Sequence, residues 1–169
     1  MRHYLVSLLL AAISTSCADH AALAPKPLTT GALSIQLDQT SYTTSEASGN
    51  GGGIRGTIRN NDSRPYYTKL GDAFGGGEEQ DQLYIAAFSD GALERETPSA
   101  SWSAVQAPLL IEGVRFVILK PGRTYRFIAT ATGDVQPGNY RISVSYRSTI
   151  ADEEPAVTGK DVSSVFLIR

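Results

Sequence analysis

The stretch NYRISVSYR, residues 139–147, shows most clearly which fold the chain adopts. Its apolar side chains recur at every second position, and polar or charged side chains fill the positions between them. Because successive side chains of a strand point to opposite faces, this period of two predicts a strand with one buried face. The inward side chains are expected to be Tyr140, Ile142, Val144 and Tyr146, and the outward ones Arg141, Ser143, Ser145 and Arg147.

Other segments of the chain repeat this pattern. Alternation of apolar and polar side chains predicts strands in LSIQLD (33–38), IRGTIRN (54–60) and RTYRFIATAT (123–132). More continuous apolar runs, typical of strands covered on both faces, are QLYIAAF (82–88), VRFVIL (114–119) and VSSVFLI (162–168). The tract from Ala100 to Gln106 could form one helical turn or a short edge strand.

Turn residues separate these runs, and no long segment carries a helical stripe. Pro121-Gly122 is suited to a tight antiparallel connection, and a second Pro-Gly turn pair, Pro137-Gly138, precedes Tyr140. Seven or eight strands without helices predict an all-β fold, an antiparallel two-sheet sandwich over residues 33–169. A closed barrel fits the same pattern.

The N-terminus has the layout of an export signal. Arg2 and His3 precede an apolar run of about ten residues, YLVSLLLAAI, which is too short to span a bilayer as a helix. The single cysteine of the chain, Cys17, follows this run and has no second cysteine with which to form a disulfide.

This arrangement resembles the lipobox of bacterial lipoproteins. Thr15 and Ser16 suit its small positions, whereas Ser14 stands where leucine is usual. The resemblance implies that Cys17 receives a diacylglyceryl group and becomes the mature N-terminus. Residues 1–16 would then be the signal peptide, residues 17–32 a flexible tether containing two prolines, and residues 33–169 the folded domain. Cleavage after Ala18, which would give a secreted or periplasmic soluble protein, is the alternative.

The lipobox also predicts a location. The protein is expected to be anchored to a membrane of the bacterial cell envelope through an N-terminal lipid. In a Gram-negative cell, the expected location is the outer membrane.

A second resemblance rests on the turns and late strands. The succession TIRNNDSRPYY, LKPGRTYRF and QPGNYRISVSY is similar to the immunoglobulin-like domains of many exported bacterial lipoproteins. It is also similar, more weakly, to the domain family named after an intracellular proteinase inhibitor. In both readings Tyr140 is expected to form a tyrosine corner, in which its hydroxyl bonds back to the preceding backbone.

Catalytic and metal chemistry find little support in the residues. The only histidines, His3 and His20, precede the domain, so a Ser-His-Asp or Cys-His arrangement is not expected. No cofactor or metal site is expected either, because the acidic clusters 72–81 and 152–154 lack the spacing of a calcium loop. The 15 basic and 17 acidic residues give a net charge of -2, which argues against a nucleic-acid partner.

The possible binding surface consists of outward arginines. Arg55, Arg59, Arg141 and Arg147 would form one basic sheet face if their strands were neighbours. Pairing of these arginines with Asp and Glu is the interpretation we favour over a binding role. Trp102 could be an exposed binding aromatic or, as we prefer, a plug over the end of the sandwich.

These observations predict a non-enzymatic envelope lipoprotein whose sandwich binds another protein or serves as an accessory module. The alternative is a proteinase-inhibitor-like domain acting through a surface loop, either Gly71 to Gln82 or Leu93 to Val105. An inhibitory loop should be rigid, which the glycine-rich first loop does not favour.

Overall fold

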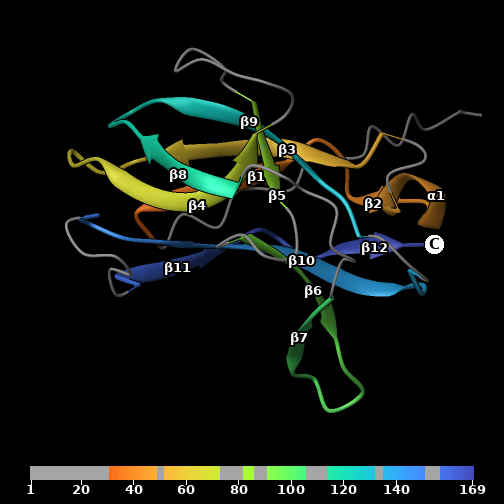
Figure 1. Cartoon of the computed structure of the whole chain (residues 1–169). Helices are drawn as coiled ribbons and strands as arrows, with labels where there is room; N and C mark the ends of the chain where they lie inside the picture. Colours follow the sequence, from red (N-terminus) through yellow and green to blue (C-terminus); the bar gives the residue numbers. More distant parts are fainter. Residues whose placement is uncertain are drawn as a thin grey trace, which may run out of the picture.

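The computed structural model describes residues 31–48, 52–72, 82–85, 91–105, 114–131, 135–150 and 157–169. As the sequence predicts, these residues form an all-β fold, and two sheets lie one over the other (Figure 1). These residues include no candidate for a membrane-spanning helix.

Each sheet has six strands. In sheet A the spatial order is β1 (Leu33–Leu37), β3 (Ile54–Asn60), β9 (Thr124–Ala129), β5 (Gln82–Ile85), β4 (Tyr66–Asp72) and β8 (Val114–Leu119). In sheet B it is β2 (Ser41–Tyr42), β12 (Phe166–Ile168), β10 (Gly138–Tyr146), β6 (Gly91–Glu96) and β7 (Trp102–Ala104), with β11 (Gly159–Val162) also pairing with β10.

The core lies between the sheets and is built by the predicted alternation. The inward residues of 139–147 are all buried, as are Leu33, Ile35 and Leu37 of β1. Three rings of sheet B pack together in the core: Phe166 lies edge-on to Tyr42, with ring centres 5.4 Å apart, and tilted against Tyr140, with ring centres 6.1 Å apart. Each fully buried large apolar side chain contributes roughly 1.5–3 kcal/mol, so this alternation supplies the main driving force of folding.

The expected number of strands and the expected absence of helices are wrong. The described residues contain twelve strands, because several are only two to four residues long and carry too few positions to show a period. A short helix, α1 (Thr44–Ala47), is closed by a capping box in which Glu46 accepts from the Thr43 amide at 2.6 Å, while the Thr43 hydroxyl accepts from the Glu46 amide at 3.2 Å.

The expectation of a purely antiparallel fold is also wrong. β5 pairs parallel with β9, and β2 pairs parallel with β12. Parallel neighbours need a long connection. Here strands of both sheets intervene, since β6, β7 and β8 lie between β5 and β9 in the chain.

Two of the apolar runs differ from the expectation of strands covered on both faces. VRFVIL forms β8, the edge of sheet A, and its Ile118 side chain is 45% exposed. VSSVFLI is not one strand: β11 ends at Val162, and β12 begins at Phe166. Ser163 lies in this break, and its hydroxyl accepts a hydrogen bond from the Ile142 amide at 2.9 Å.

The turn at Pro121-Gly122 forms, but it does not connect paired strands. Gly122 has φ of 68°, and the Arg123 amide donates to the Lys120 carbonyl at 3.2 Å. The strands on either side, β8 and β9, are separated in sheet A by β4 and β5. The hydroxyl of Tyr125 joins them instead, because it donates to the Ile118 carbonyl at 3.1 Å and accepts from the Lys120 amide at 2.8 Å.

Candidate binding site at the β6–β7 hairpin

The most distinctive feature of the described surface is the hairpin formed by β6 and β7, which projects from sheet B (Figure 1). The paired part of the hairpin and its tip, residues 94–104, lie within the segment Leu93 to Val105. The short strand β7 confirms the second of the two alternatives for Ala100 to Gln106, an edge strand. Pro98 suits the turn because its fixed φ matches the second position of a β-turn, and the Ala100 amide closes that turn on the Thr97 carbonyl at 2.9 Å.

The tip of the hairpin is held by a compact hydrogen-bond network. The Thr97 hydroxyl lies 3.0 Å from the Ser99 hydroxyl and 2.7 Å from the Ser101 hydroxyl. The Thr97 amide also donates to the Ser101 carbonyl at 2.8 Å. Ala100 has a positive φ of 56°, which costs a non-glycine residue about 1 kcal/mol and persists only where the surroundings fix it. The exposed tip is therefore conformationally restricted.

A buried carboxylate fixes the base of the hairpin. Glu94 of β6 is 5% exposed although it lies on the outer face of sheet B. Its oxygens accept from Arg141 Nε at 2.7 Å, from the Ser143 hydroxyl at 2.9 Å and from Lys160 Nζ. Burial opposes ionisation, but the hydrogen bonds from Lys160, Arg141 and Ser143 outweigh it, so the pKa of Glu94 is lowered. Strands β6, β10 and β11 are thereby tied together.

Trp102 continues this cluster outward. The guanidinium of Arg141 lies 4.3 Å from the centre of its ring, in a cation–π contact. The preferred interpretation of Trp102 as a plug over the sandwich end is wrong, because β7 pairs at the edge of sheet B and the described core does not include this side chain. The ring is half-buried, and one part of it remains available on the surface.

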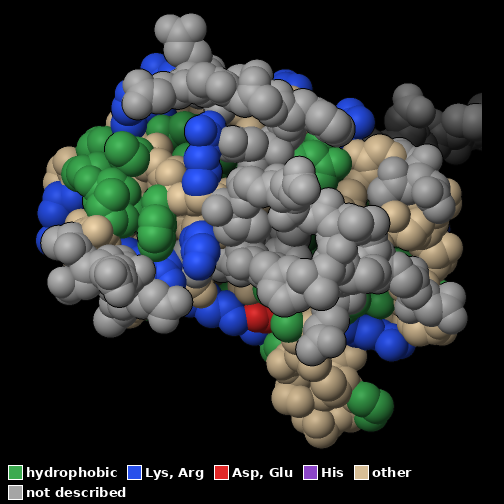
Figure 2. Space-filling view, in the orientation of Figure 1, with side chains coloured by type: hydrophobic (Ala, Val, Ile, Leu, Met, Phe, Trp, Pro, Cys, Tyr) green, Lys and Arg blue, Asp and Glu red, His purple; other side chains and the backbone are tan. Residues whose placement is uncertain are grey.

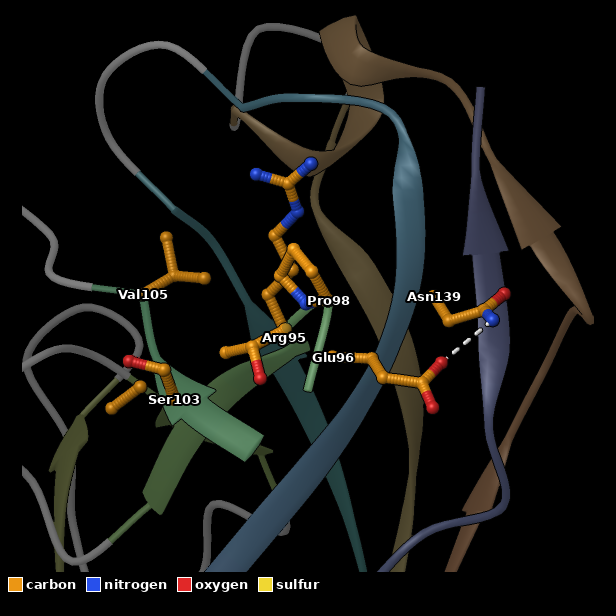
Figure 3. Close-up of a pocket in the computed structure, with 8 residues that line it drawn as sticks. Arg95, Glu96, Pro98, Ser103, Val105 and Asn139 are labelled. Carbon is orange, nitrogen blue, oxygen red and sulfur yellow. Dashed lines mark hydrogen bonds between the residues drawn. The ribbon is translucent and has the colours of Figure 1, made fainter. Parts of the chain in front are cut away.

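A groove of about 570 Å³ runs beside the hairpin. Two of its polar side chains already have partners: Arg95 Nη2 donates to the Pro137 carbonyl at 3.0 Å, and Asn139 Nδ2 donates to Glu96 at 2.8 Å (Figure 3). Figure 3 shows Arg95 and Pro98 between Val105 on one side and Glu96 on the other. The groove is lined by Arg95, Glu96, Thr97, Pro98, Ser103, Ala104, Val105 and Asn139.

The four predicted surface arginines do not form one face. Arg55 and Arg59 lie on β3 of sheet A and are exposed, whereas Arg141 lies on β10 of sheet B. Arg147 follows β10 and reaches across to sheet A, where its backbone bridges Tyr67 and its guanidinium lies 5.5 Å from the ring of Phe116. The proposed common face fails because β3 and β10 belong to different sheets, and the favoured pairing with an acidic residue is confirmed for Arg141.

Tyr140 makes the contact that a tyrosine corner requires. Its ring is 1% exposed, and its hydroxyl donates to the Gln136 carbonyl at 2.6 Å. Burial raises the pKa of this hydroxyl, which keeps it protonated as a donor.

Several predicted features lie outside the described residues. These are Cys17 with the rest of the signal and tether up to residue 30, the glycine-rich part of the loop from Gly71 to Gln82, and the acidic cluster 152–154. Among the residues that are described, no group of His, Cys, Asp or Glu could hold a metal ion.

Glu94 and Lys160 were not recognised from the sequence as site residues. In the run LERE, residues 93–96, alternation predicts that Glu94 points outward, but a sequence pattern does not show which strands pair with β6. No local signal marks Lys160, because its contact with Glu94 depends on β11 and β6 lying on the two sides of β10.

No protein-family model matches the chain, and a search of curated proteins finds no significant similarity.

Proposed function

We propose that the protein is a non-enzymatic lipoprotein of the bacterial cell envelope, anchored through Cys17, whose domain binds a protein partner through the β6–β7 hairpin. The fold we propose is an immunoglobulin-like sandwich, supported by its two stacked sheets and by the Tyr140–Gln136 contact. The anchor is supported by the lipobox-like sequence that ends at the only cysteine.

The observation that carries the binding role is the ordered, projecting hairpin. Binding through a flexible loop costs the free energy of ordering that loop, whereas a loop already fixed by its own hydrogen bonds avoids most of this cost. The Thr97, Ser99 and Ser101 hydroxyls restrict the tip, and the Glu94 cluster restricts the base. The half-buried ring of Trp102 offers a partner apolar area, and the groove, which Trp102 does not line, offers hydrogen-bonding groups.

Site-specific photo-crosslinking in cells tests this proposal. A photoreactive amino acid is placed at Ser99 on the tip, and a matched control carries it at Thr149, which is exposed and lies outside the hairpin. The proposal expects a discrete protein adduct from the Ser99 position and none of that size from Thr149. Equal adducts at both positions, or none at Ser99, would contradict it.

A second candidate function is inhibition of a protease by the hairpin tip. The rigidity of residues 97–101 favours it, since an inhibitory loop must be rigid, although these residues form a tight turn and not an extended segment. A panel of purified proteases separates the two candidates. Inhibition that is lost in Ser99→Asp and Ala100→Asp would support the inhibitor, whereas the absence of inhibition across the panel leaves the partner-binding role.

A further inference from the structure

The outer face of sheet A carries a cluster of three arginines contributed by two neighbouring strands. In the register of β3 and β9, Arg126 pairs with Thr57, which lies between Arg55 and Arg59. Arg126 is therefore diagonal to both other arginines, at a separation of about 7–8 Å that is typical of diagonal pairs in a sheet. All three are exposed. We call Arg55, Arg59 and Arg126 the basic face.

The basic face is not neutralised by described carboxylates. None of the ion pairs among the described residues involves its arginines. Asp38 lies across from Arg55, whose carbonyl accepts from the Asp38 amide at 3.0 Å, but their side chains form no ion pair. Apart from Asp38, the partners of the three arginines on adjacent strands are uncharged: Ser34, Thr57, Gln82, Thr124 and Ile128.

Apolar and aromatic side chains accompany these charges on the same face. Ile128 pairs with Arg55, and Tyr84 lies beside Ile128 on β5; both are half-buried. Toward the edge of the sheet, Tyr67 pairs with Ile118. Hydrophobic and basic side chains lie next to one another over β4 and β8 in Figure 2. Arginine combined with tyrosine and isoleucine suits the headgroup region of an anionic membrane, where guanidinium groups meet phosphates and rings enter the interface.

The position of the N-terminus brings this face within reach of a membrane. Strand β1, the first of the domain, forms one edge of sheet A and is paired with β3, which carries Arg55 and Arg59. If Cys17 carries lipid, as the proposed function holds, about fifteen residues separate the lipid from β1. Fully extended, such a segment spans roughly 50 Å at most.

From the charge of this face, its apolar side chains and its place next to the tether, we infer that the outer face of sheet A docks on an anionic phospholipid surface. The two acyl chains of the Cys17 lipid would then anchor the protein, and the basic face would orient the domain on the same membrane. Docking of this face would leave sheet B and its hairpin directed away from the bilayer, because the two sheets form opposite layers (Figure 1).

Vesicle co-sedimentation of the full chain carrying Cys17→Ala tests the inference without any contribution from acylation. The chain is mixed with vesicles of phosphatidylcholine alone or of an equal mixture of phosphatidylcholine and phosphatidylglycerol. The leader, which includes Arg2, is the same in all variants of the chain, so a difference between variants in binding to the anionic vesicles reports on the basic face. We expect stronger binding to the anionic vesicles, weakened by added salt.

The double variant Arg59→Gln, Arg126→Gln should weaken binding to the anionic vesicles by about thirtyfold. Arg55 is left unchanged, because its side chain also donates a hydrogen bond to the Gly52 carbonyl at 3.2 Å. The charge-matched control is Arg64→Gln, Arg169→Gln, which removes two exposed cations that lie off this face. Thermal unfolding checks that both variants fold.

Equal binding to both vesicle types would overturn the inference, as would an equal loss in the two double variants, which would indicate net charge alone. If the arginine variant leaves vesicle binding unchanged but loses a cross-linked acidic protein, the face binds that protein and the inference fails. None of these outcomes depends on whether Cys17 is acylated in cells, which is measured separately.

Discussion

The hydroxyl of Tyr140 donates to the carbonyl oxygen of Gln136 at 2.6 Å and so closes the bend that leads into β10. The ring of the same tyrosine is almost completely buried against Phe166. One side chain therefore fixes both the entry of a central strand and the packing of the core behind it.

Tyr140→Phe should lower the free energy of unfolding by about 1–2 kcal/mol, because the ring remains while the Gln136 carbonyl loses its donor. Denaturant unfolding measures this difference. The control is Tyr146→Phe on the same strand face, where the hydroxyl lies beside Asp161. That carboxylate is only half-buried and also accepts from the Leu33 amide at 2.8 Å, so the loss should be smaller. Equal, negligible losses would show that the Tyr140 contact does not stabilise the bend.

The ion cluster at Glu94 should make stability depend on pH. The pKa of Glu94 is held below its ordinary value of 4.5 in the folded protein, so its ionised form contributes stability at neutral pH. That contribution should be present above about pH 5 and should disappear as the pH falls through the lowered folded-state pKa. At neutral pH, Glu94→Gln should cost about 2 kcal/mol, because Arg141 and Lys160 lose their shared partner.

Unfolding of Glu94→Gln and of wild type is compared from neutral to acid pH. The comparison isolates the contribution of the Glu94 carboxylate, since the other carboxylates are common to both proteins. The difference in unfolding free energy between wild type and Glu94→Gln should become smaller as the pH falls. Glu96→Gln is the matched control, because Glu96 lies on the same strand but makes a single exposed hydrogen bond with Asn139. A gap that stays constant from neutral to acid pH would show that the ionised carboxylate of Glu94 does not stabilise the fold.

Individual strands could be predicted from the sequence where one face of the strand is apolar and the other is polar. Strands β1, β3, β9 and β10 show this alternation, and their inward residues are buried as expected. In β4 the alternation is hidden, because the buried inward position 68 holds a threonine whose hydroxyl donates to the Ser145 carbonyl at 2.9 Å.

The surface was harder to predict because it depends on which strands become neighbours. An outward position is a local property of a strand, but the partner across the ladder is set by the whole topology. For this reason, the sequence pattern does not show that Arg55 and Arg59 neighbour Arg126 in sheet A and that Arg141 lies in the other sheet. The capping box of α1, by contrast, could have been recognised in the sequence from Thr43 and Glu46.

The tether should be dispensable for folding. The first strand begins at Leu33, and the described core is made of residues from Leu33 onward. Deleting Ala21 to Thr30 should leave the thermal midpoint of unfolding nearly unchanged. A large decrease in that midpoint would show that this segment packs on the domain.

Attachment of lipid to Cys17 is the central claim, because both the proposed location and the docking of sheet A on a membrane start from it. Metabolic labelling with a clickable palmitate tests it most directly, comparing wild type with Cys17→Ala. We predict that the wild-type protein is labelled and recovered with membranes, and that Cys17→Ala carries no label. Equal labelling of the two proteins, or no label on the wild type, would contradict the claim.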